Sequence, residues 1–339
     1  MLGKQIRMKR RSLGLSLQEL ADEIALNGMP ITRAALSNYE RDKTVPSDSI
    51  LSEIAKALGT STDFLKYGDF GNVDITFFDE PNLIAKRRSE LTSYIKLCLD
   101  SQLTLDEALG RKRGFSFPQP VLITKDNLDD VEQAASHARK QFRLGEMPIA
   151  SVVGTLESNG WYVFELAQKI ELKLVSGSIS QRKIPFLAFG DFRSIVVLRH
   201  ELLRELSKVY IQCPNRATAS LAAERFASAM LIPASCVYEE FGRERKHISF
   251  YELSIAKQKY GLSRMKLAER LETLGVISQE TKDEIVSMMQ KTFLLKRNPA
   301  QDMVFFHEYP EALRMKYLCA DAEEKLPEEY KGALGILPD

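Results

Sequence analysis

Helix-start signals follow one another so closely at the beginning of the chain that only a cluster of short helices can satisfy them. Ser16 and Glu19 form a Ser-x-x-Glu capping box, Thr32 offers a hydroxyl N-cap, and Ser47 starts a further helix. Apolar residues at helical spacing follow these signals, and glycine or proline separates the runs. The pattern predicts five small helices packed into one core within residues 1–67.

The third of these helices has two different faces. Ala35, Leu36 and Tyr39 form its expected inner face, while the other face has hydrogen-bonding side chains long enough to reach base edges. GLSLQELADEIA, ITRAALSNYERDKTVPS and LSEIAKALGTSTDFL resemble the phage-repressor, or Cro-like, helix-turn-helix family over nearly its whole length. A longer turn, LNGMPI, is the departure from the family pattern.

This resemblance implies a lambda-repressor-like domain with a recognition helix in the major groove of DNA. Arg33 is the first choice for a guanine contact, Arg41 and Lys43 are expected on phosphates, and a module that only dimerises is the alternative. The full set of expected DNA-binding residues is Gln18, Thr32, Arg33, Ser37, Asn38, Arg41 and Lys43.

Composition favours a soluble, cytoplasmic protein with two or three domains. The chain has 339 residues, of which 44% are hydrophobic and 27% charged, and it has neither a membrane-length apolar run nor a signal-peptide pattern at its beginning. The four cysteines form no C-x-x-C pair, so a disulfide framework or thiolate metal site is not expected. The net charge is +1, but positive charge is concentrated at Lys4, Arg7, Lys9, Arg10 and Arg11.

Residues 68–125 are expected to connect two domains. Turn formers in residues 68–81 indicate a hinge, and apolar residues at helical intervals from Ile84 to Leu109 predict a long helix, with an interruption near Ser101 as one alternative. Such a helix can be an interdomain spacer or a dimer seam.

The next region, residues 126–282, begins with two predicted helices, the second starting at Pro148, and a strand at 161–166. Two β-rich runs and the helical FRSIVVLRHELLRELSKVYI follow. This order, together with SLAAERFASAMLIP and the later helical stretch, resembles the ImmA/IrrE family of zinc-dependent endopeptidases. The resemblance implies a mainly helical, zincin-like domain with a small sheet, hence an α+β chain with a C-terminal extension at 283–339.

The expected metal chemistry is incomplete in this sequence. The family's His-Glu-x-x-His motif places two imidazoles on one helix turn beside a catalytic glutamate, and a third ligand lies on the following helix. Here His200 and Glu201 are present, Arg204 replaces the second histidine, and Ser220 aligns with the third ligand. Glu224 is a conceivable shifted carboxylate, but a protonated guanidinium cannot bind a metal.

We therefore expect a pseudo-metallopeptidase without a metal or cofactor, in which Arg204 pairs with Glu201 or Glu224. Ser249 and Ser263 start two further helices in a second helix-turn-helix pattern, for which packing or partner binding is favoured over DNA reading.

The sequence predicts a DNA-binding transcription regulator, dimeric on an operator, whose protease-like domain is a sensor or partner-binding module. An autoregulating antitoxin with a toxin partner is a close variant. An active zinc-dependent endopeptidase that cleaves a repressor is the alternative from another class, and no membrane partner is expected.

Overall fold

The computed structural model shows an α+β protein that divides into two compact units. Both units are made of separate segments of the chain: the first contains 1–115, 160–191 and 310–339, and the second contains 116–159 and 192–309. The predicted boundaries at 67, 125 and 282 stay a prediction. The structure describes residues 2–26, 28–60, 62, 65, 73–111, 114–166, 172–180, 182–192, 194–294 and 306–327.

Four short helices open the first unit: α1 (Leu2–Ser12), α2 (Leu17–Leu26), α3 (Arg33–Glu40) and α4 (Asp48–Ala57). Their caps are those expected from the sequence, because Thr32 and Ser47 accept the backbone N–H groups of Ala35 and Ile50. The expected fifth helix lies largely outside the described residues. One apolar core joins the helices, built around Ile6, Leu20, Ile24, Leu36, Leu51, Ile54 and Leu58.

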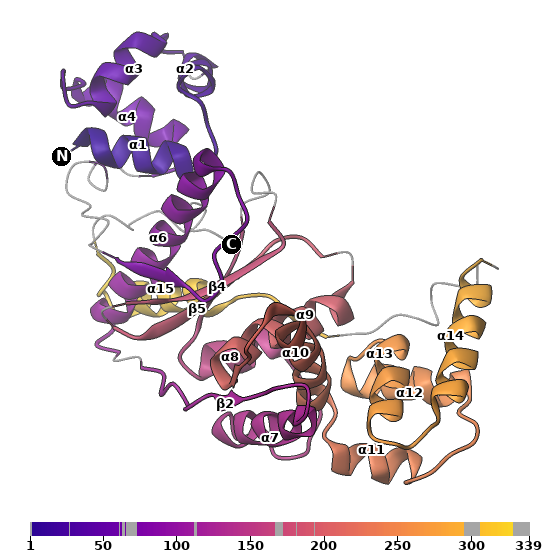
Figure 1. The fold of residues 1–339 in the computed structure, drawn as a ribbon. Helices are drawn as coiled ribbons and strands as arrows, with labels where there is room; N and C mark the ends of the chain where they lie inside the picture. Colours follow the sequence, from indigo (N-terminus) through magenta and orange to yellow (C-terminus); the bar gives the residue numbers. More distant parts are fainter. Residues whose placement is uncertain are drawn as a thin grey trace. The chain divides into compact units, whose positions relative to one another are not determined.

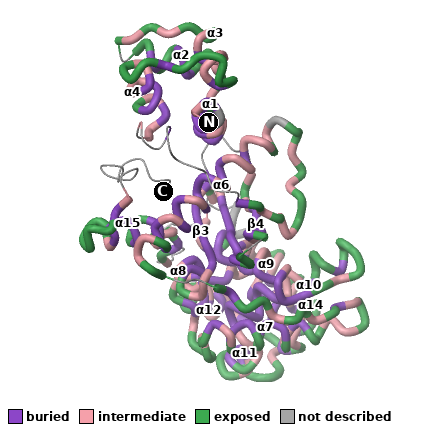
Figure 2. Tube along the Cα trace, turned by 90° about the vertical axis from the view of Figure 1, so that its left-hand side faces the viewer, coloured by how far each residue is buried: buried purple, intermediate pink, exposed green. Residues whose placement is uncertain are grey.

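The long helix α6 (Ala85–Ala108) supports both α1 and a mixed sheet of the first unit (Figure 1). It is continuous through Ser101, and Figure 2 shows much of it as buried. The sheet has the order β1-β4-β5-β3, in which β4 is antiparallel to both of its neighbours and β5 is parallel to β3. The strands are β1 (Ile75–Phe77), β3 (Tyr162–Glu165), β4 (Leu174–Ile179) and β5 (Ile184–Phe189).

Part of the segment expected as a hinge, 68–81, forms a strand instead. Ile75 to Phe77 form an edge strand because they pair with Ile179 to Gly177 and pack against the core that α6 covers. Residues 68–72 lie outside the described residues.

A C-terminal helix, α15 (Ala312–Ala322), packs against α6. Its Lys316 is 1% exposed and donates to Asp106 at 2.7 Å and to Gln102 at 2.6 Å, while the Tyr162 hydroxyl donates to the same Asp106 oxygen. A buried charge needs such partners, so α15 is part of the first unit's core.

The second unit is mainly helical. Helices α7, α9 and α10 pack on one another, and the short strands β2 and β6 pair in parallel. In chain order its elements are β2 (Val121–Leu122), η1 (Leu128–Asp130), α7 (Val131–Gln141), α8 (Val152–Ser158), α9 (Ile195–Tyr210), β6 (Ile211–Gln212), α10 (Arg216–Leu231), α11 (Ala234–Phe241), α12 (Phe250–Tyr260), α13 (Arg264–Thr273) and α14 (Gln279–Leu294).

The start predicted for the second helix of this region is wrong. Helix α8 begins at Val152 rather than Pro148, because Ser151 caps it and Glu308 accepts the N–H groups of Val152 and Val153 at 2.9 and 2.8 Å. Glu308 also pairs with Arg199, whose side chain is fully buried and stacks on Phe306. A carboxylate far along the chain thus fixes the beginning of this helix.

The sheet and the His-Glu helix expected in one domain fall into different units: strands β3 to β5 belong to the first, and α9 belongs to the second. Within the described ranges, no helix has the length and apolar character needed to cross a bilayer.

Candidate nucleic-acid interface and charged cluster

The expected DNA-binding residues lie on α2, α3 and the turn after α3, within one small domain. Arg33, Arg41 and Lys43 are exposed, while Ser37 and Asn38 are half-buried. Two of the expected residues have local roles: the Thr32 hydroxyl caps α3, and the Gln18 amide donates to Asp22 at 2.9 Å. Arg33, Arg41 and Lys43 are therefore the exposed cations of this set.

A buried ion pair that the sequence did not reveal joins α1 to α3. Arg10 contacts Glu40 through two nitrogens, one of them at 2.9 Å, and it donates to the Leu15 carbonyl at 2.5 Å. Both side chains are at most 10% exposed. Because bidentate guanidinium-carboxylate pairs fix geometry as well as charge, this pair holds α3 against α1.

This arrangement agrees with the comparisons with known proteins. Residues 6–65 match the helix-turn-helix family model HTH_3. The helix-turn-helix segment is also similar to YonR, an uncharacterized HTH-type transcriptional regulator derived from the SPβ prophage of Bacillus subtilis strain 168, with 35% identity over 75 residues. That match covers 22% of this chain and 65% of the relative's length, which is less than two thirds. No solved structure matches the chain.

A second group of charged side chains gathers where α9, α10 and α13 meet. Arg204 donates to both oxygens of Glu201 at 3.0 and 2.8 Å, and its Nε lies 3.1 Å from Glu224. Lys266 contacts the other Glu224 oxygen at 2.7 Å and Glu269 at 2.8 Å. The predicted pairing of Arg204 is thus present with both glutamates, and we call these five residues the α9 cluster.

His200 lies at the buried edge of the α9 cluster. Its Nε2 is 3.3 Å from the Ser228 hydroxyl and 3.8 Å from Glu224. Ser220, the residue aligned with the third metal ligand, is exposed on α10, and the α10 carboxylate that faces His200 is that of Glu224.

Protonation in this region follows burial and the two cations. The pKa of His200 is lowered to about 4, mainly by burial; Glu224 opposes this shift, and the charges of Lys266 and Arg204 add to it. Burial raises the pKa of Glu224, but the hydrogen bond from Lys266 and the charge of Arg204 outweigh it and hold that pKa below its ordinary value. The imidazole is therefore neutral and the carboxylate ionised near neutral pH.

The residues present do not fit a catalytic zinc. Such an ion takes three protein ligands, whereas here one histidine and one carboxylate face each other and two cations contact that carboxylate. Across the described residues, no group of three or more histidine, cysteine, aspartate or glutamate side chains is placed to hold a metal. The sequence analysis did not identify Lys266 as a member of this site, because Lys266 is distant along the chain from Glu224.

Helix α13 has its main cations turned inward. Lys266 contacts Glu224, and Arg270 is 2% exposed, pairs with Glu132 and donates to the Ile232 carbonyl. These contacts favour the packing interpretation of the second helix-turn-helix pattern, because side chains used inside the unit are not open to DNA.

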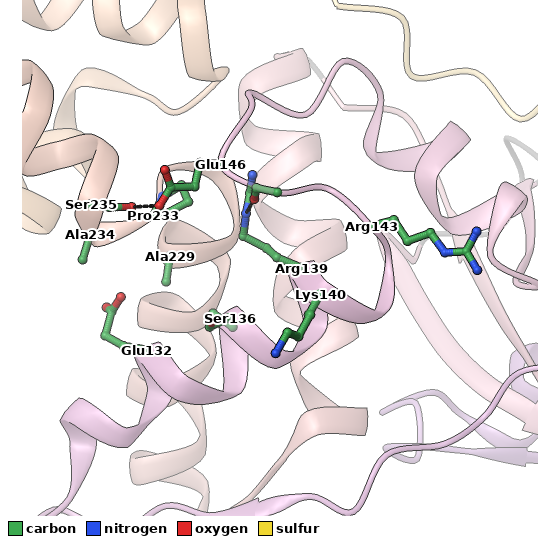
Figure 3. A pocket seen from close by; sticks show the side chains of 12 residues that line it. Glu132, Ser136, Arg139, Lys140, Arg143, Glu146, Ala229, Pro233, Ala234 and Ser235 are labelled. Atoms are coloured by element: carbon green, nitrogen blue, oxygen red, sulfur yellow. Dashed lines mark hydrogen bonds between the residues drawn. The ribbon is translucent and has the colours of Figure 1, made fainter.

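A hollow of about 570 Å³ lies between α7 and the start of α11 (Figure 3). Its buried cation, Arg139, donates to the carbonyls of Gly145 and Met147 at 2.8 and 2.6 Å and to that of Met230. Figure 3 shows Glu146 bonded to Ser235 and Arg143 pointing away. Each nitrogen of this guanidinium donates to a backbone carbonyl, so Arg139 holds the loop in place.

Proposed function

We propose that this protein is a DNA-binding transcription regulator that reads an operator through its helix-turn-helix segment. The observation that carries the proposal is the match of residues 6–65 combined with a cap-defined α3 that presents exposed Arg33. Repressors of this type bind paired half-sites, so the proposed species on DNA is a homodimer.

Base and phosphate contacts should respond differently to substitution. Arg33→Ala is expected to weaken binding to the operator by about 1 to 3 kcal/mol and to relax its sequence preference, whereas Lys43→Ala should weaken binding to all duplexes evenly. Selection of sites from the chain's own genome supplies the operator, and gel shifts measure both variants. Arg314→Ala, which removes an exposed arginine from α15, is the matched control. Equal binding by all three variants would overturn this placement of the recognition helix.

The second part of the proposal concerns the helices around the α9 cluster. They form a degenerate metallopeptidase-like body in which Arg204 and Lys266 replace the charge of a metal ion, and this body serves as a sensor or partner-binding module. The support is electrostatic: two cations on Glu224 balance acidic groups that would be unfavourable to bury alone. An antitoxin that neutralises a toxin through this body is one specific form of the proposal.

Metal analysis tests this second part. Purified protein is expected to contain substoichiometric zinc that does not change in His200→Ala. Stoichiometric zinc lost in that variant, or cleavage of a substrate protein that Glu201→Gln abolishes, would contradict the proposal and favour the endopeptidase instead.

A further inference from the structure

The basic run at the beginning of the chain separates into residues with different roles once α1 is folded. Lys9 is buried, which lowers its pKa to about 8, and Arg10 is held by Glu40. Arg7 is exposed and Arg11 is half-buried. Two cations are thus used inside the fold, and Arg7 and Arg11 face the surface.

These two arginines border a hollow that also reaches the recognition helix. The hollow has a volume of about 210 Å³ and is lined by Arg7, Arg10, Arg11, Leu17, Ser37, Glu40 and Arg41. A larger hollow of about 840 Å³ has Arg11, Gln18 and Arg33 in its lining. Arg11 is therefore shared by two hollows that contain four of the expected DNA-binding residues.

Positive charge in the smaller hollow is not balanced. Glu40 is its acidic lining residue, and both of its oxygens are taken by Arg10. Among the residues that the structure describes, no salt bridge joins Arg7, Arg11 or Arg41 to a carboxylate. Three guanidinium groups around one hydroxyl-bearing hollow form a surface suited to an oxyanion.

Helix α6 orients one of these groups. Arg11 donates to the Ser89 hydroxyl at 3.2 Å, which ties its guanidinium to the first turns of α6. Burial is the main cause of a lowered pKa at Arg11, and repulsion from Arg7 and Arg10 acts in the same direction, against the opposing charges of Glu40 and Glu90. An anion placed in the hollow would relieve that repulsion.

We propose that Arg7, Arg11 and Arg41 form a binding site for a phosphate group of the DNA backbone. The proposal rests on the proposed function and extends its contact surface from the recognition helix to α1. Arginine suits this role because its planar fork can give two parallel hydrogen bonds to one phosphate. Contacts of this kind fix register on the duplex without reading sequence.

Salt dependence of duplex binding tests the site. The full chain is titrated against a fluorescently labelled duplex of mixed sequence by anisotropy over a series of salt concentrations. Arg7→Ala/Arg11→Ala should weaken binding and reduce the slope of log affinity against log salt by about 1 to 2, since each lost phosphate contact lowers it by about 0.9. Arg7→Lys/Arg11→Lys should keep most of the slope, because it keeps the charge.

Arg314→Ala/Lys325→Ala is the matched control, because it removes two exposed cations from the same unit away from the hollow. If the wild-type chain binds no duplex, the proposed function itself fails. If wild type binds and the Arg7/Arg11 variant keeps the control's slope, the phosphate site is wrong and the regulator proposal stands.

Inorganic pyrophosphate distinguishes a site for the DNA backbone from a site for a small phosphorylated ligand. Pyrophosphate should compete with the duplex weakly, and only at concentrations at which any salt would screen the attraction between protein and DNA. Tight, Arg7- and Arg11-dependent binding of pyrophosphate with an unchanged duplex slope would overturn the proposal and assign the hollow to a small phosphorylated ligand. Circular dichroism melts confirm that each variant is folded.

Discussion

Buried charged residues stabilise the interior of each compact unit. Arg199 and Glu308 have side chains 0% and 1% exposed, and among the described residues each forms its salt bridge with the other. Arg199 also donates to the Ile149 carbonyl at 2.5 Å, and Glu308 caps α8. The pair therefore links α9, α8 and the segment around residue 308 within the second unit.

Removing one member of this pair should be strongly destabilising. Glu308→Ala is expected to lower the free energy of unfolding by about 3 to 5 kcal/mol, because it leaves a buried guanidinium unpaired. Glu80→Ala, which breaks an exposed pair with Arg88, should lower it by less than about 1 kcal/mol. Urea unfolding of both variants measures the difference, and similar losses would contradict the assigned burial.

His200 gives the second unit a dependence on pH. Its folded pKa of about 4 lies below the ordinary value of 6.5, so between these values the unfolded chain binds a proton that the folded chain does not. The free energy of unfolding should therefore rise as pH increases through this window. His200→Gln should flatten that rise relative to the exposed control His247→Gln, as measured by urea unfolding at several pH values. An unchanged profile in His200→Gln would place the pH dependence elsewhere.

At the level of elements, the sequence predicts a helix start well where the capping residues lie within a few positions of that start. The box of Ser16 and Glu19 and that of Ser249 and Glu252 are both formed, and the starts of α2 and α12 follow directly from them. The start of α8 could not be found in this way, because part of its cap comes from Glu308. The contact of Lys266 with Glu224 was missed for the same reason, since α13 and α10 are distant in sequence.

The capping box of α12 offers a test at this scale. Ser249→Ala should lower the free energy of unfolding by about 1 kcal/mol, because the Glu252 N–H loses its acceptor at 3.1 Å. Ser220→Ala, an exposed position in the first turns of α10, should change it by less than about 0.5 kcal/mol. A large effect at Ser220 would mean that this residue has contacts beyond those seen here.

For the whole molecule, the sequence indicated an α+β chain with a helix-turn-helix segment but not how its segments combine. Strand β1 joins β4 across about a hundred residues, and α15 returns to α6. Pairings of this range depend on the complete core and leave no local pattern. Each compact unit accordingly contains segments that are distant in the sequence.

Removal of residues 310–339 should affect the two units differently. The truncated chain lacks Lys316, so Asp106 in the first unit loses its buried cation, while Glu308 and the second unit are retained. Hydrogen exchange should therefore show lost protection in α6 and the sheet but not in α9 and α10. Lys316→Met in the full chain should produce a smaller change of the same kind. Uniform loss of protection would mean that the units unfold as one.

Because each unit is made of separate segments, its interacting residues are synthesised at different times. As the chain leaves the ribosome, α6 emerges early, and Lys316 of α15, which contacts Asp106, is added about two hundred residues later. Arg199 is likewise synthesised well before Glu308, its partner in the buried ion pair. The helix-turn-helix segment has its own core and can fold first, so a nascent chain could present a DNA-binding surface before the rest of the protein has closed around its buried charges.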